Sequence, residues 1–333
     1  ILNRLSGPLC DVVRSGGPVR SGGTPGSSLG TAITGQDDGR EMLGGLERGN
    51  LFVVPLDDVR HWYRYHHLFA DVLRAHLIQE QPDRLPDLHR RASEWYEHNG
   101  SPADAIRHAL AAEDFNRAAD LAERAWPSMS GSYQSIAWLS WLKDLPDEVV
   151  RVRPVLCVSY AWAFLNAGNL EAAEAWLQHA ERACPELTEG WLEAADRTGE
   201  PPQAPPVGMI IANEELYQSL PVSLAAARAY LAQAVGDLPG TMKYAQRVLD
   251  LVTEDSLQWR ADVTALLGLA YWASGDLQAA HQVFFEGLTG MSPLGFIVGA
   301  FVLAEIKATL GHLHEAMSIC EHALQLANEH GEP

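Results

Sequence analysis

Cysteine is scarce in this chain, and its spacing limits the chemistry that the chain can carry. The 333 residues include four cysteines that lie far apart and form no C-x-x-C pair: Cys10, Cys157, Cys184 and Cys320. Zinc sites, redox motifs and disulfide frameworks depend on closely spaced cysteines. Cys157 and Cys184 lie among apolar residues with helical spacing, so we predict buried thiols in a reducing cytoplasm.

Long hydrophobic runs are missing as well. No apolar segment reaches the roughly 20 residues that are needed to span a bilayer. The first residues lack the basic region and the continuous apolar region of a signal peptide. Residue 1 is Ile rather than Met, which we interpret as the start of a fragment or of a processed product. The sequence therefore predicts a cytoplasmic protein without membrane contact.

Positive charge is in short supply. The chain has 24 Lys and Arg residues against 43 Asp and Glu residues, which gives a formal net charge of −19. Residues 1–80 hold 8 basic and 9 acidic side chains, so nearly all of the excess lies in residues 81–333. Because an acidic surface repels phosphate backbones, we predict that residues 81–333 do not bind nucleic acid.

Catalytic motifs are absent or lie in an unsuitable context. The chain has no G-x-x-x-x-G-K-[ST] phosphate-binding loop and no H-E-x-x-H motif. Ser28 lies in a G-x-S-x-G pattern, but its flanks are low in complexity, whereas a nucleophilic serine needs a strand before it and a helix after it. Adjacent histidines, such as His66 and His67, point in different directions on a strand or helix. We therefore predict neither an enzyme nor a metal site.

Glycine and proline gather in two stretches that no packed element would tolerate. Residues 15–40 are rich in Gly, Ser, Thr and Pro, which predicts a mobile loop. Residues 196–208 contain four prolines and are typical of an exposed loop between helices. The second loop is either a partner contact or a spacer.

The segment between these loops begins with a short helix and a hairpin. Residues 41–49 have helical spacing, and the stretches NLFVVPLDD and RHWYRYH are typical of two strands around a turn at residues 57–58. Pro55 suits an edge strand, because it cannot donate to a neighbouring strand. A helix over residues 67–79 follows. Helix, hairpin and helix in this order predict a winged-helix-like domain over residues 1–80.

From residue 84 on, amphipathic helices follow one another without a further predicted strand. One segment has the spacing of a tetratricopeptide repeat (TPR), in which small residues let two antiparallel helices approach closely: Leu267, Gly268, Tyr271, Gly275, Ala280 and Phe284. Further copies of its second half begin at Gly168, Gly236 and Gly311. Such helix pairs cover their apolar faces by stacking, so we predict a mainly α fold with a TPR-like α-solenoid over residues 84–333.

Tryptophan is concentrated on consecutive predicted helices: Trp138, Trp141, Trp162 and Trp176. Two interpretations stay open, a ligand-binding aromatic groove and an inter-helix core. We favour the core, because aromatic side chains bury large areas where helix pairs stack.

One long segment resembles a known family. The stretches LNRLSGPLCDVV and LERGNLFVVPLDDVRHWYRYHHLFADVLRAHL, followed by degenerate TPR helices, look like the middle of the MalT-like proteins, large ATP-dependent regulators of the LuxR family. The run from Leu46 to Leu77 is the specific part. The resemblance implies a signal-transducing ATPase switch that consists of a nucleotide-binding module, a winged helix, a helical-repeat sensor and a DNA-binding helix-turn-helix. It also implies that this chain lacks the first and last of these, so that ATP, ADP and DNA bind only to the full-length protein and this chain itself holds no cofactor.

The resemblance also implies a role for one histidine. The family pattern R-Y-H-x-L-F, preceded here by Trp62, falls on Arg64, Tyr65, His66, Leu68 and Phe69. In this class of switches a winged-helix histidine approaches the β-phosphate of bound ADP and holds the resting state closed. The implied nucleotide contact is therefore His66, with the other five residues as its winged-helix support. A purely structural histidine is the alternative.

Two functions stay open from the sequence. The first, which we favour, is a regulatory fragment in which the helical repeats bind a small-molecule inducer or an inhibitory protein and the winged helix couples binding to nucleotide state. The family resemblance adds self-association on activation. The second is a stand-alone TPR-type scaffold that holds peptides or helices.

Overall fold

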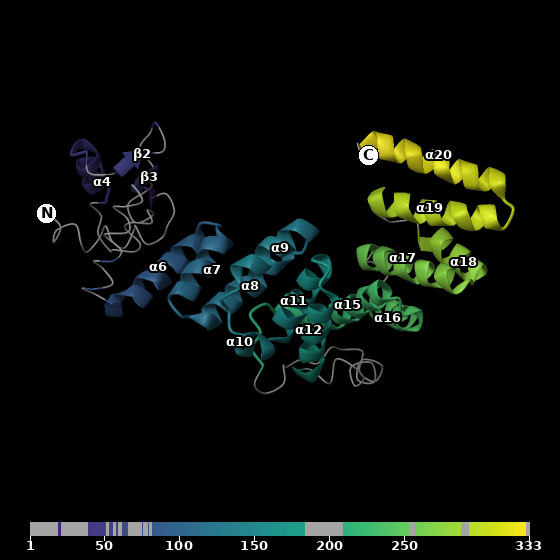
Figure 1. The fold of residues 1–333 in the computed structure, drawn as a ribbon, viewed down its shortest axis with the longest axis horizontal. Coiled ribbons are helices and arrows are strands. Elements are labelled where there is room, and N and C mark those ends of the chain that lie inside the picture. The colour runs from purple at the N-terminus through teal and green to yellow at the C-terminus, as the bar shows by residue number, and fades with distance from the viewer. Residues whose placement is uncertain are drawn as a thin grey trace. The chain divides into compact units, whose positions relative to one another are not determined.

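A computed structural model describes residues 19–20, 39–50, 53–55, 58, 62–65, 75, 79, 82–183, 209–252, 257–287 and 293–330. These residues are mainly helical, with one small sheet near the N-terminus (Figure 1). Past residue 84 the described residues contain helices and no strand, so the predicted mainly α class is confirmed. No helix in the described part is both long and apolar enough to cross a membrane.

Contacts divide the chain into two compact units. The first comprises Ile1–Met129 and Ala137–Val150, and the second comprises Ser130–Ile136 and Arg151–Pro333. The predicted boundary between domains at residues 80–84 lies inside the first unit and stays a prediction.

The first unit contains a three-stranded antiparallel sheet in the order β1-β3-β2, made of β1 (Val19–Arg20), β2 (Val53–Pro55) and β3 (Trp62–Tyr65). Val53 pairs with Tyr65, and Pro55 pairs with Tyr63, which confirms the predicted hairpin. Pro55 lies on the edge strand β2. Proline has no backbone N–H, and an edge strand tolerates it because one side of the strand has no neighbour to receive a hydrogen bond. The preceding helix α4 (Gly39–Arg48) contacts β2 and buries Leu46.

The prediction that residues 15–40 form a loop throughout is wrong at both ends of this stretch. Val19 and Arg20 form β1 and pair with Tyr63 and Trp62 of β3, while α4 already begins at Gly39. Strand pairing uses backbone groups, so a glycine-rich composition gives little sign of it. With β1 in place, β3 is the central strand, and Tyr63 is paired on both sides, with Val19 of β1 and Pro55 of β2.

Six helical segments follow: η1 (Pro82–Arg84), α6 (Leu85–His98), α7 (Pro102–Ala111), α8 (Phe115–Met129), α9 (Ser132–Trp141) and α10 (Asp147–Arg151). In the first unit α6 contacts α7, and α7 contacts α8. Trp138 is fully buried, lies edge-on to Trp126 at 4.9 Å between ring centroids, and donates its indole N–H to the Ala122 carbonyl at 3.1 Å. The interpretation of this tryptophan as core is confirmed.

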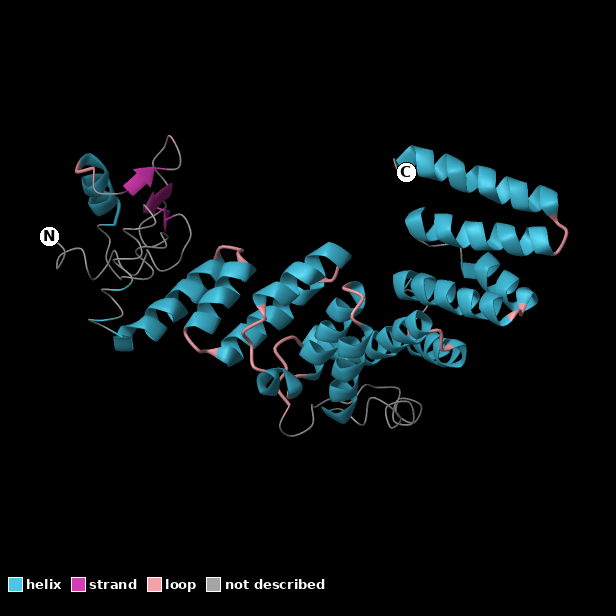
Figure 2. Cartoon of the chain, viewed as in Figure 1, coloured by secondary structure: helices cyan, strands magenta, loops and turns pink. Residues whose placement is uncertain are grey.

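The second unit is built from helical hairpins, drawn as cyan helices in Figure 2. Its helices are α11 (Pro154–Asn166), α12 (Leu170–Ala183), α14 (Glu214–Gln218), α15 (Leu220–Val235), α16 (Leu238–Leu251), α17 (Leu257–Ser274), α18 (Leu277–Gly287), α19 (Pro293–Thr309) and α20 (Leu313–His330). Four pairs are hairpins: α11 with α12, α15 with α16, α17 with α18, and α19 with α20.

The hairpins stack in sequence. The first helix of each hairpin contacts the first helix of the next, as in α11 with α15, α15 with α17 and α17 with α19. The second helix of each hairpin also contacts the next first helix. Helix contacts that run mainly between neighbouring repeats are characteristic of a solenoid, so the predicted TPR-like stack is confirmed.

Burial separates the two helices of a hairpin. On α11 the consecutive residues Val155, Leu156, Cys157 and Val158 are all buried, because neighbours lie on several sides of this helix. On α12 burial is confined to one face, which carries Trp176 and three other residues. First helices thus lie inside the stack. Cys157 is a buried free thiol as predicted, Cys320 is an exposed one, and Cys10 and Cys184 lie outside the described residues.

A left-handed glycine ends the first helix of each hairpin. Their φ angles are +74°, +78°, +86° and +85° for Gly168, Gly236, Gly275 and Gly311. A side chain is strained at such angles, and glycine is not, which explains why the breaks recur at this residue type. In three hairpins the next residue caps the second helix by accepting an N–H, from Ala172, Gly240 and Ala279.

The hairpin α17–α18 contains the six residues of the TPR pattern. A Cβ atom on Gly268 would lie 2.7 Å from Cε2 of Phe284, so only glycine allows the two helices to approach this closely. Phe284 and Ala280 are buried on the facing side of α18, and Leu267 is buried beside Gly268. Tyr271 accepts the N–H of Asp276 through its carbonyl, just past the turn at Gly275.

Candidate functional site

The predicted nucleotide contact, His66, lies outside the described residues, as do Leu68 and Phe69. Trp62, Arg64 and Tyr65 belong to β3, the central strand of the small sheet. The role of His66 and its support therefore stays a prediction. The described residues contain no cluster of three or more potential metal ligands.

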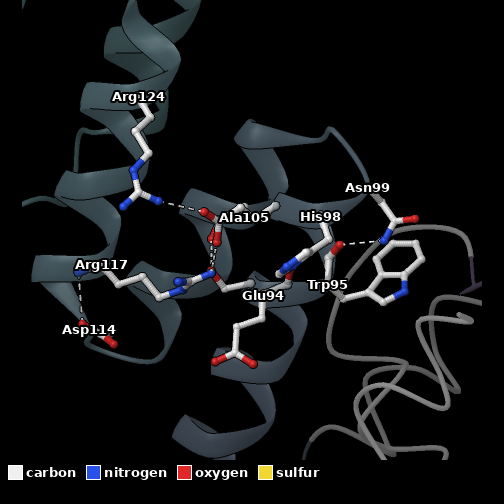
Figure 3. Close-up of polar contacts among 10 residues, drawn as sticks. Glu94, Trp95, His98, Asn99, Ala105, Asp114, Arg117 and Arg124 are labelled. Carbon is white, nitrogen blue, oxygen red and sulfur yellow. Dashed lines mark hydrogen bonds and ion pairs between the residues drawn. The ribbon is translucent and has the colours of Figure 1, made fainter. Parts of the chain in front are cut away.

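A polar network ties together α6, α7 and α8 (Figure 3). Glu97 of α6 accepts from Arg117 at 2.6 Å and from Arg124 at 3.0 Å, both on α8. Arg117 also donates through Nε to the Ser93 hydroxyl at 3.0 Å, and Ser93 in turn donates to the Ala105 carbonyl of α7 at 2.8 Å. One arginine thus links three helices, and Ser93 is itself fully buried.

Beside this network lie two buried histidines that the sequence did not single out. Nδ1 of His89 on α6 lies 2.7 Å from Nδ1 of His108 on α7. The ring of His108 stacks on Tyr96, with centroids 5.4 Å apart and planes 12° from parallel. At this distance one Nδ1 is protonated and donates a hydrogen bond to the other, unprotonated Nδ1. If both Nδ1 atoms carried a proton, this hydrogen bond would be lost. The only sequence signal is a polar residue on an apolar helical face.

An ion-pair clamp joins two repeats in the second unit. Arg228 of α15 donates through Nε and Nη2 to both oxygens of Glu181 at 2.7 and 2.6 Å, and through Nη1 to Glu174. Both carboxylates lie on α12, and their hydrogen bonds and charges oppose the effect of burial, leaving the pKa of Arg228 raised. A bidentate contact of this kind fixes the orientation of the guanidinium group as well as its distance from the carboxylate.

Three partly exposed aromatic rings meet on the first helices of three successive hairpins: Trp162 of α11, Tyr230 of α15 and Trp259 of α17. The Trp162 ring centroid lies 5.3 Å from that of Tyr230 and 6.3 Å from that of Trp259. The Trp162 indole N–H donates to the Ser223 hydroxyl at 3.0 Å, which fixes its orientation. We call these three rings the Trp162 cluster.

An acidic side chain accompanies the Trp162 cluster. Asp262 lies one helical turn after Trp259 and is exposed at the surface of α17. Neighbouring protein nevertheless displaces part of its water and raises the pKa of this carboxyl. Burial raises the pKa of Tyr230 to about 12, and the charge of Asp262 adds to this effect. The carboxylate and the aromatic cluster therefore share one environment.

Comparisons with known proteins agree with this architecture. The model of the MalT winged helix domain matches residues 26–85, and the model of the MalT-like TPR region matches residues 223–333. The HTH-type transcriptional regulator MalT of Vibrio cholerae is 26% identical over 313 residues. The chain is a MalT-like central region. This confirms the resemblance seen in the sequence, and the alignment covers 91% of the chain but only 27% of the Vibrio cholerae protein.

A solved structure is similar at a lower level. It is a signal transduction ATPase with numerous domains (STAND) from Pyrococcus horikoshii, with a tetratricopeptide repeat sensor. The identity is 13% and the TM-score 0.45, over 98% of this chain and 52% of that protein.

Proposed function

We propose that the chain is the coupling and sensor region of a MalT-like transcriptional regulator. In this proposal the helical repeats bind an inducer or an inhibitory protein, and the winged helix couples this binding to the nucleotide state of the full-length protein. The observation that carries the proposal is that a MalT winged-helix match and a MalT-like TPR match occur in one chain, in that order.

The polar network of α6, α7 and α8 supports the coupling role. The winged-helix match ends at residue 85, where α6 begins. Because Glu97, Arg117 and Ser93 bind these three helices to one another, they move together rather than separately. A displacement of α6 is then passed to α8 instead of being lost in the intervening turns.

The stacked hairpins support the sensor role. The hairpins contact one another mainly through their first helices, so residues of several first helices come together, as in the Trp162 cluster. A ligand that touches two or three hairpins at once favours one curvature of the stack over another. Such differential binding is what shifts a conformational equilibrium.

For nucleotide coupling, His66 is the residue to test. An imidazole N–H donates to a β-phosphate oxygen of ADP in the resting state, and nucleotide exchange releases the contact. In the full-length protein we expect His66→Ala to speed the release of a fluorescent ADP analogue and to raise basal transcription. His67→Ala is the matched control, because position 67 is the variable position of the family pattern.

The outcome separates the two functions that the sequence left open. Rapid ADP release by His66→Ala, together with wild-type release by His67→Ala, supports the switch. If both variants hold ADP as the wild type does, the coupling role of His66 is excluded. If the full-length protein binds neither nucleotide nor DNA, the stand-alone scaffold replaces the proposal.

A further inference from the structure

The Trp162 cluster differs from an ordinary aromatic core in its exposure and in the polar ring groups that have no hydrogen-bond partner among the described residues. Its three rings stay partly exposed, whereas Trp138 is fully buried and Trp176 is 9% exposed. Among the residues that the structure describes, neither the Tyr230 hydroxyl nor the Trp259 indole N–H has a hydrogen-bond partner. Three partly exposed rings on successive hairpins therefore offer aromatic surface to a ligand.

The carboxylate of Asp262 adds a negative charge that has no partner among the described residues. It makes no hydrogen bond or ion pair with any described residue. Burial raises the pKa of this carboxyl, so the folded protein stabilises its ionised form less well than water does. An exposed carboxylate without a protein partner is available to pair with a cationic ligand.

From these observations we infer that the Trp162 cluster and Asp262 form a binding site for an organic cation, an ammonium or a guanidinium group. Aromatic faces attract cations through the ring quadrupole, and they do so more strongly where water is displaced. A cation there gives Asp262 the opposite charge that it lacks. The net charge of −19 also draws cations toward the protein.

The same chemistry has two sources, a free small-molecule amine and a basic side chain of a partner protein. This inference rests on the proposed sensor role, because it names the chemical class that the helical repeats recognise. It concerns binding to the repeats alone, so it is tested without nucleotide or DNA. If the cation-binding experiment fails, the conclusion from the His66 experiment still stands. If the His66 experiment fails, the inference of a cation site still stands.

The experiment is isothermal titration of the chain with two cationic probes, each paired with a neutral analogue. Tetramethylammonium chloride is compared with tert-butanol, and a short arginine-containing peptide with the same peptide carrying citrulline. We expect each neutral analogue to bind at least about tenfold more weakly than the better cation. Preference for tetramethylammonium identifies a small amine, and preference for the arginine peptide identifies a basic protein segment.

Three variants locate the site. Asp262→Asn and Trp259→Leu should each weaken cation binding about tenfold. Asp250→Asn is the matched control, because Asp250 is an exposed acid on a second helix, α16, and its loss should leave binding unchanged. Asp262→Asn should keep the fold, since the asparagine carries no charge to desolvate, and circular dichroism verifies this. The inference is overturned if neither cation binds, or if cations and neutral analogues bind equally well. It is also overturned if Asp262→Asn and Asp250→Asn change cation binding to the same extent.

Discussion

The contact between Gly268 and Phe284 gives the sharpest prediction about the fold. In Gly268→Ala the new Cβ would lie 2.7, 2.8 and 2.9 Å from three ring atoms of Phe284. The ring cannot move away easily, because it is 1% exposed and belongs to a cluster with Val302, Leu303 and Ile306. Overpacking of this kind costs about 1–3 kcal/mol. Alanine gains up to about 1 kcal/mol over glycine through helix propensity, so the two effects oppose each other.

We expect the clash to exceed the propensity gain, with net destabilisation of the second unit. For a unit of this size each kcal/mol corresponds to roughly 2–4 °C in melting temperature, which calorimetry resolves. Gly45→Ala is the matched control, because Gly45 is helical and has nothing within 4 Å of its Cβ position. There only the propensity gain applies, and stability should rise or stay constant.

A double variant tests the cause. Phe284→Leu makes room for a methyl group at position 268, so Gly268→Ala should cost less in that background, with a coupling of about 0.5–3 kcal/mol. A stabilised Gly268→Ala protein, or strictly additive effects of the two substitutions, would refute the idea that this glycine sets the distance between α17 and α18.

Three further predictions concern the polar contacts. Arg228→Ala should destabilise the second unit by about 1–3 kcal/mol, because Glu174 and Glu181 lose their hydrogen bonds and their counter-charge. Arg228→Lys should recover part of this loss in thermal melts. Wild-type stability of both variants would contradict the clamp. Arg117→Leu should increase hydrogen exchange in α6 and α8 together, whereas Arg107→Leu, which removes an exposed pair with Asp104 and no contact of Glu97, should not. Tyr230 should ionise near pH 12, so that the stability from its neutral phenol is complete below about pH 10 and is lost as the pH rises through 12. Asp262→Asn should lower the pKa of Tyr230, as followed by phenolate absorbance with Tyr230→Phe as the reference, and an unchanged midpoint would show that the two groups do not interact.

Much of the helical architecture could be predicted, because each feature has a local cause. Gly168, Gly236, Gly275 and Gly311 were recognisable as breaks since a helix end at positive φ favours glycine. The approach of Gly268 to Phe284 followed from the spacing of small and large residues along one hairpin. The placement of Pro55 on an edge strand followed from its missing N–H.

Other features depend on partners that sequence spacing does not reveal. Arg228 lies 47 and 54 positions from its two glutamates, and nothing in the residue types shows which acids it meets. The contact between His89 and His108 joins two helices whose register is set by apolar packing. Strand β1 pairs through its backbone, so its glycine-rich surroundings concealed it.

The Trp162 cluster shows where an interpretation from residue type stops. Sequence reasoning placed Trp162 in the inter-helix core, and the ring does pack on buried residues of the second unit. Its partial exposure, the neighbouring Tyr230 and Trp259, and the unpaired Asp262 come from the stacking of three hairpins. Stacking across repeats, rather than the composition of any one helix, produces the candidate site.

In the proposed switch the winged helix and the helices after it respond to nucleotide state. Hydrogen–deuterium exchange on the full-length protein measures this response, with ADP compared with a non-hydrolysable ATP analogue. We expect that replacing ADP lowers the protection of β2 and β3, and that α6, α7 and α8 change together. Identical exchange of these segments in both nucleotide states would contradict it.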